Sequence, residues 1–182
     1  MLVLPLYYLL YLGLFEALRR ADFANALLST VLAFVGVTLS LATPSALSML
    51  WLSQRHAAAT TEAIRAQLQA AGEAILASDI WHGTGSFLGG ALAQSGAVLI
   101  CVLMLRTGVL GKATAWLGIL MHGLDLAHIV LGPFVPAAGV ALMATAGPLF
   151  PIWFFLVGRR LFRLVEDGPG RDFEAPIGSE GS

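Results

Sequence analysis

Five apolar stretches, each of about the length that a helix needs to cross a lipid bilayer, limit the fold of this chain more than any other feature. Inside the hydrocarbon layer a helix satisfies its backbone polar groups within its own segment, and about 20 apolar residues span the layer. The sequence therefore predicts an all-α fold, a polytopic transmembrane helical bundle of about five spanning helices in one domain, residues 1–165. The expected spans cover residues 2–18, 26–52, 83–105, 113–133 and 137–158.

The composition supports a membrane protein and argues against other classes. Apolar residues make up 58% of the chain and charged residues 12%, against roughly 25% charged residues in soluble domains. The formal net charge of −1 provides no basic surface, so no nucleic-acid partner is expected. The single cysteine, Cys101, excludes an internal disulfide and a CxxC zinc motif, and no cofactor is expected.

Two segments outside these stretches have a different composition. Residues 60–77 place Ile64, Leu68 and Ile75 on one helical face and charged residues elsewhere, which predicts an amphipathic helix. Such a helix would lie along the membrane surface or cap the bundle. Residues 166–182 combine Gly, Pro, Ser and acids with little to bury, which predicts a disordered cytoplasmic tail.

Prolines interrupt two of the expected spans. Pro44 predicts a kink after Thr43 in the second span, because proline removes a backbone donor and clashes with the preceding turn. Pro148 and Pro151 predict a kink in the fifth span, which would leave backbone carbonyls unpaired.

Basic residues are distributed unevenly between the two sides that alternating spans would create. Lys and Arg are retained in cytoplasmic loops, so their distribution predicts orientation. Eight of the ten fall on one side, which predicts a multi-pass protein of the plasma membrane with its N-terminus outside and its C-terminus in the cytoplasm. The eight are Arg19, Arg20, Arg106, Lys112, Arg159, Arg160, Arg163 and Arg171, and the other two are Arg55 and Arg65.

The four tryptophans lie near the expected ends of spans. Trp116 and Trp153 lie toward span ends, and Trp51 and Trp81 border the expected outer loop. Because aromatic rings concentrate at both membrane interfaces, we expect all four at the level of the headgroups.

The segment GILMHGLDLAHIVLG, residues 118–132, places three ionisable residues inside an otherwise apolar span: His122, Asp125 and His128. On a helix they lie within about 120° of arc, and leucines such as Leu120 occupy the opposite face. A carboxylate in contact with lipid would cost at least about 2.5 kcal/mol, so we expect the three side chains to face neighbouring helices or a cavity.

The preceding span offers partners for these residues. If it runs antiparallel, Gln94 near its middle and His82 at its outer end could meet them. Its small residues would let another backbone approach closely and are Gly85, Gly89, Ala93 and Gly96. We use the term polar cluster for His122, Asp125, His128, Gln94 and His82.

Three interpretations of the polar cluster stay open. In the first, Asp125 accepts hydrogen bonds from one or both histidines, Gln94 or Thr38 completes the set, and the cluster holds helices together. In the second, it forms an ion or proton relay or a small-molecule site, because ionisable residues inside membranes often mark pathways. In the third, His82, His128 and Asp125 bind a metal, although residues spaced i, i+3 on one helix spread too widely without help from His82 or Asp79.

Three segments resemble a bacterial and archaeal membrane family, domain of unknown function 4386. They are ALSMLWLSQRHAAATTEAIRAQLQAAGEAILA, LICVLMLRTGVLGKATAWLGILMHGL and GPLFPIWFFLVGRRLFRL. The resemblance covers about residues 26–165 and implies a six-helix bundle, of which this chain would lack a complete first helix. That family has no assigned activity, so the resemblance implies a fold and no site residues.

The sequence therefore favours a non-enzymatic integral membrane protein whose buried polar residues serve helix packing. No nucleophile elbow, P-loop or HExxH pattern occurs in it. The lipid bilayer is the expected partner, with a second copy or another membrane protein left open. The alternatives are a small transporter, ion or proton relay or sensor that uses the polar cluster, and a metal-dependent membrane enzyme.

Overall fold

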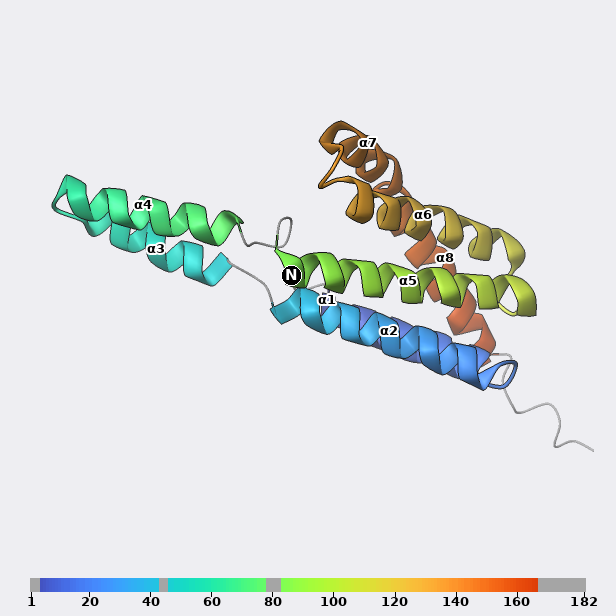
Figure 1. Cartoon of the computed structure of the whole chain (residues 1–182). Coiled ribbons are helices and arrows are strands. Elements are labelled where there is room, and N and C mark those ends of the chain that lie inside the picture. Colours follow the sequence, from blue (N-terminus) through green and yellow to red (C-terminus); the bar gives the residue numbers. More distant parts are fainter. Residues whose placement is uncertain (1–3, 43–45, 78–82, 167–182) are drawn as a thin grey trace, which may run out of the picture.

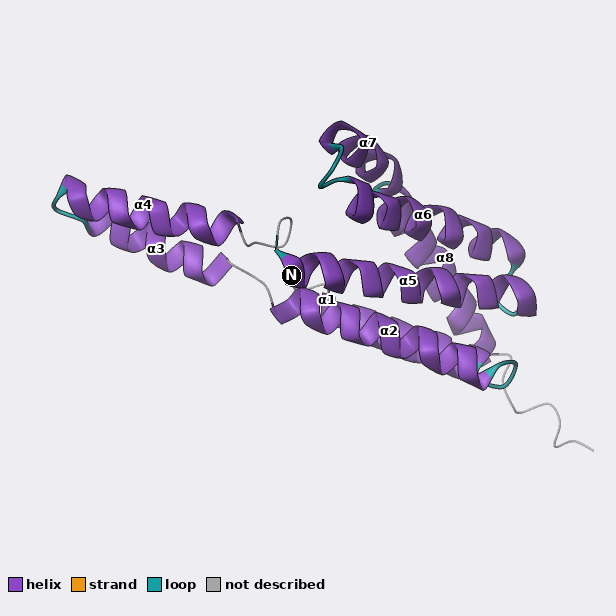
Figure 2. Cartoon of the chain, in the orientation of Figure 1, coloured by secondary structure: helices purple, strands orange, loops and turns teal. Residues whose placement is uncertain are grey.

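The computed structural model describes residues 4–42, 46–77 and 83–166, and within these ranges the chain forms helices and short turns with no strand (Figure 2). The all-α prediction is confirmed. The helices are α1 (Leu4–Leu18), α2 (Phe23–Ala42), α3 (Ala46–Ala58), α4 (Glu62–Ala77), α5 (Thr84–Thr107), α6 (Lys112–Leu131), α7 (Pro136–Ala146) and α8 (Leu149–Glu166). Of the predicted tail, residues 166–182, Glu166 is the last residue of α8 and the rest lies outside the described residues.

Four segments of the described chain are long and apolar enough to cross a membrane, as a multi-pass protein requires. The first expected span corresponds to α1, whose 15 residues fall short of the roughly 20 that the hydrocarbon layer needs. Of the five expected spans, four thus correspond to described segments of sufficient length, and the first corresponds to a shorter apolar helix. The four segments are Phe23–Ala58, Thr84–Thr107, Lys112–Leu131 and Pro136–Leu164.

The second expected span, residues 26–52, includes parts of two helices. It covers most of α2 and the first half of α3, while the kink expected at Pro44 lies outside the described residues. α3 pairs with α4 in an antiparallel hairpin that packs against no other described helix. The amphipathic helix expected over residues 60–77 is confirmed as α4, but it pairs with α3 and does not cap the bundle (Figure 1).

The fifth expected span, residues 137–158, is also divided between two helices. α7 ends at Ala146, a turn covers Gly147 and Pro148, and α8 follows. The interruption expected at Pro148 is confirmed. Pro151 lies in the first turn of α8, where a backbone N–H would have no intrahelical acceptor, so this proline does not disturb the helix.

α2 and α5 pack antiparallel with their backbones in contact. An added Cβ at Gly36 would overlap the backbone N of Ala93, and one at Gly96 would lie 2.6 Å from the carbonyl oxygen of Ser29. A Cβ at Gly89 would lie 2.8 Å from Ser40 Oγ. The close approach expected from the small residues of α5 is confirmed, and its partner is α2.

The remaining bundle helices complete a core around α5 and α6. α1 packs against α2 and runs beside α8, where the Tyr7 and Phe154 rings meet edge to face at 5.2 Å between centroids. The largest fully buried side chain is Trp153 of α8. Its position corrects the prediction that this ring lies at headgroup level, whereas Trp116 is 60% exposed. Trp81 lies outside the described residues.

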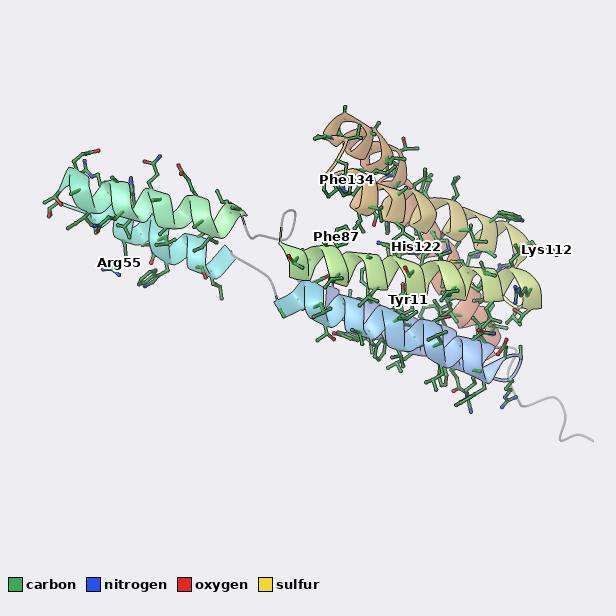
Figure 3. The ribbon with its side chains drawn as sticks, viewed as in Figure 1. Tyr11, Arg55, Phe87, Lys112, His122 and Phe134 are labelled. Carbon is green, nitrogen blue, oxygen red and sulfur yellow. The ribbon has the colours of Figure 1, made fainter. Side chains whose placement is uncertain are left out.

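The basic residues of the bundle gather at one end of it. The α1–α2 turn, the α5–α6 turn with Lys112 and the C-terminus of α8 all lie there, and Phe134 lies at the opposite end (Figure 3). At the same end Asp22 precedes α2 and accepts hydrogen bonds from the backbone and side chain of Asn25, which hold the pKa of this carboxyl below its usual value. The bundle thus brings the basic residues of three separate segments to the same end.

Candidate functional site

The centre of the site is a hydrogen-bonded bridge between α5 and α6. The Gln94 side chain lies between His122 and Asp125, which stand three residues apart on the facing side of α6. Its Nε2 donates to Asp125 Oδ2, and its Oε1 is 2.6 Å from His122 Nδ1. Figure 3 places His122 midway along the bundle. The single amide of Gln94 on α5 is therefore hydrogen bonded to both polar side chains of α6.

This bridge determines the tautomer of His122. Because the amide nitrogen of Gln94 faces the carboxylate, its oxygen is left as an acceptor, so Nδ1 of His122 carries the proton and donates. Nε2 is then an acceptor, and it is buried without a hydrogen-bond partner. The imidazole is 1% exposed and stands edge to face against Trp153 and Phe150, at 4.9 and 5.5 Å between centroids. The ring is held by packing on one side and by Gln94 on the other.

Asp125 and His128 have different surroundings from His122. Asp125 is only partly buried, and its Oδ2 accepts the hydrogen bond from Gln94 Nε2. His128 Nδ1 donates to the carbonyl oxygen of Gly139 in α7, at 2.9 Å. This bond ties α6 to α7 where an added Cβ at Gly139 would lie 2.8 Å from the Cα of Gly132.

The prediction that a histidine donates a hydrogen bond to Asp125 is wrong: among the described residues, Gln94 is the donor. Gln94 takes that place because its amide offers a donor and an acceptor at once, which suits a carboxylate and an N–H together. Thr38, the other candidate to complete the set, instead shares a 2.7 Å hydrogen bond with Tyr8. The prediction that the polar face of α6 turns inward is confirmed, since Leu120 on the opposite face is 54% exposed.

A metal site finds no support in the described part of the chain. His82, which the metal interpretation needs, lies outside the described residues. Elsewhere in the described ranges no group of three His, Cys, Asp or Glu side chains is arranged to hold an ion. His128 is engaged by Gly139, and Asp125 by Gln94.

Sequence reasoning missed the contribution of α8 and of the small residue that admits it. Trp153 Nε1 donates to the carbonyl oxygen of Thr114, at 3.1 Å, across the α6–α8 contact. Gly118 makes room for this, because a Cβ there would overlap both Trp153 Nε1 and Cys101 Sγ. The indole therefore packs at the junction of α5, α6 and α8. Gly118 four residues before His122 is the available signal, but spacing alone does not say which helix fills the gap.

Two cavities are formed by other parts of the chain. One of about 170 Å³ is lined by Asn25, Arg106 and neighbouring apolar residues at the basic end. The other, of about 550 Å³, lies in the α3–α4 hairpin. Neither has His122, Asp125 or His128 in its lining.

Comparison with known proteins adds no assignment. No protein family matches the chain, and neither a curated protein nor a solved structure matches it. Function is therefore inferred from the geometry of the bundle.

Replacing Trp153 by phenylalanine is expected to lower the free energy of unfolding by about 0.5–1.5 kcal/mol, the net contribution of one hydrogen bond. Phenylalanine keeps an aromatic ring against His122 but cannot donate to Thr114. Thermal unfolding of the detergent-solubilised protein measures the change. Trp116→Phe is the matched control, because Trp116 is exposed and should tolerate the same substitution without effect. Equal stability of the two variants would contradict the role assigned to the indole N–H.

Proposed function

We propose that this chain is a non-enzymatic, multi-pass protein of the plasma membrane whose polar cluster stabilises the helix bundle. The observation that carries this proposal is the bridge through Gln94, which engages both Asp125 and Nδ1 of His122. Buried polar groups in a bilayer need such partners whatever else the protein does. The lipid bilayer is its partner, and a second copy or another membrane protein is a further candidate.

The outer surface of the bundle supports membrane embedding. Large apolar side chains are exposed on several helices, among them Leu9 on α1, Val31 on α2 and Phe155 on α8. Exposed apolar surface of this extent is unusual for a protein in water and suits contact with acyl chains. With the basic end in the cytoplasm and α1 as a fifth crossing, the N-terminus lies outside and the C-terminus inside. Membership of the family domain of unknown function 4386 is also proposed, and it rests on the sequence resemblance alone.

A proton relay is the second candidate function. Two features favour it: Asp125 is partly exposed, and the hydrogen-bonded path from it leads through Gln94 to His122, whose Nε2 is free to accept a proton. A relay would use Asp125 as the group that exchanges protons with the surroundings.

Proton flux into reconstituted vesicles distinguishes the two functions. Vesicles that contain a pH-sensitive dye and hold a potassium diffusion potential are compared with protein-free vesicles. The structural role predicts no protein-dependent flux, and Asp125→Asn, which can still pair with Gln94, should behave as the parent protein. A relay predicts flux that Asp125→Asn abolishes while Asp22→Asn, at the basic end outside the spans, retains it. Flux of the second kind would overturn the structural proposal.

A further inference from the structure

An open, mostly apolar groove runs along the α3–α4 hairpin. The cavity of about 550 Å³ falls within the range of ligand pockets, roughly 300–1,000 Å³. Leu47 in its wall is 82% exposed and Trp51 is 54% exposed. The lining consists of Leu47, Ser48, Trp51, Leu52, Ala71 and Ile75.

The hairpin by itself has little to hold it together. α3 has 13 residues and α4 has 16, and helices of this length are marginal in water without packing partners. The buried positions between them are few and small, chiefly Leu52, Ala59 and Gly72. No other described helix packs against the hairpin. Something other than these helices must therefore cover its apolar side.

Polarity changes along the length of the hairpin. The groove is lined by the first half of α3 and the second half of α4, which are the halves connected to the bundle. Charged residues gather toward the turn between the helices: Arg55, His56, and the Glu62–Arg65 ion pair at 3.6 Å. Glu73 is the exception in the second half of α4, where it accepts a hydrogen bond from Gln69.

The groove begins close to the end of α2, whose 20 residues alone are enough to cross the hydrocarbon layer. α2 ends at Ala42 and α3 begins at Ala46, so the intervening chain can separate the two helix ends by at most about 14 Å. The headgroup layer of a bilayer adds roughly 5–8 Å on each side of a hydrocarbon layer of about 30 Å. The apolar half of the hairpin therefore lies within reach of the boundary between acyl chains and headgroups.

Trp51 and Arg55 have the arrangement of a membrane-interface pair. The Arg55 guanidinium carbon lies 4.8 Å from the centroid of the Trp51 ring. Indoles favour the headgroup level, and a guanidinium there can bind a lipid phosphate while its stem covers apolar surface. Trp51 lines the apolar groove and Arg55 is the first of the charged residues toward the turn, so the pair joins the two parts of the hairpin.

We propose that the α3–α4 groove binds an acyl chain of an outer-leaflet phospholipid, with Arg55 at the level of its phosphate. This inference rests on the proposed membrane embedding. The lipid covers the apolar half of the hairpin, while the turn with Glu62 and Arg65 extends into water. The hairpin is then an interfacial part of the protein and not a separate soluble unit.

Spin-label accessibility of the full chain in phosphatidylcholine and phosphatidylglycerol vesicles tests the proposal. Single cysteines replace Leu47 in the groove, Thr60 in the turn and Val31 in the middle of α2, all in a Cys101→Ala background. Oxygen concentrates in acyl chains and a nickel chelate stays in water. We expect the ratio of oxygen to nickel accessibility to be severalfold higher at positions 31 and 47 than at position 60.

The three positions separate the possible failures. Nickel-dominated accessibility at 47 with oxygen-dominated accessibility at 31 would overturn the lipid groove and leave the membrane proposal intact. Nickel-dominated accessibility at both would overturn the membrane proposal. Protection of position 47 from both reagents, with dipolar broadening that disappears on dilution with unlabelled protein, would show that a second copy fills the groove, and would overturn lipid binding.

Discussion

Replacing Gly36 by alanine is expected to lower the free energy of unfolding by about 1–3 kcal/mol, the usual cost of overpacking a tight interface. The added Cβ would overlap the backbone N of Ala93 and lie 2.5 Å from the carbonyl oxygen of Gly89. Both are main-chain atoms of α5 and cannot rotate away as a side chain would. The whole of α2 must therefore move away from α5, which loosens the largest helix contact in the bundle.

Gly123→Ala is the matched control for this prediction. Gly123 also lies in a helix, but, apart from its chain neighbours and the nearby backbone of its own helix, no atom lies within 4 Å of the position that its Cβ would take. Alanine is the better helix former by up to about 1 kcal/mol, so this variant should be unchanged or slightly more stable. Thermal unfolding of both variants in the same detergent measures the difference. A Gly36→Ala protein as stable as Gly123→Ala would contradict the backbone contact between α2 and α5.

The helical class and the tight helix contact could be predicted from the sequence because each depends on a local pattern. Apolar length predicts a spanning helix, and small residues at i, i+4 and i+7 of α5 predict close approach. The partner of that contact could not be predicted, since Gly89 and Gly96 say only that some backbone comes near. Gly36 on α2 is the complementary position, and Ser29, Ala33 and Ser40 around it repeat the small-residue spacing of α5, but the pattern does not say which two helices pair.

The failures in the site have a common physical cause. Helical spacing predicts which face of α6 turns inward, but it does not predict which side chain crosses from the next helix. An aspartate between two histidines suggests direct pairing, whereas Gln94 can satisfy His122 and Asp125 together. The place of Trp153 near a span end predicts the headgroup level, whereas its ring packs in the core against His122 and over Gly118. Such a contact between distant segments leaves no local pattern in the sequence.

Replacing Gln94 by methionine is expected to be the most damaging polar change in the bundle. Methionine has a similar length but cannot hydrogen bond to either neighbour. It leaves the Nδ1 donor of His122 unpaired in a fully buried position and deprives Asp125 of its donor. Each such group costs about 1–3 kcal/mol, with Asp125 toward the lower end because it is partly exposed. Thermal unfolding in detergent measures the loss, and Gln67→Met on the exposed side of α4 serves as the control.

A double-mutant cycle then separates bridging from packing. If Gln94 acts by engaging the Asp125 carboxylate, Gln94→Met should cost less in an Asp125→Leu protein, because no charge is left without a donor. The expected coupling energy lies within about 0.5–3 kcal/mol, the range for residues that share a hydrogen-bond network. If methionine costs the same in both backgrounds, the two side chains are independent. Gln94 would then stabilise the bundle through His122 and through packing, and pairing with Gln94 would not explain why a carboxylate lies inside the span.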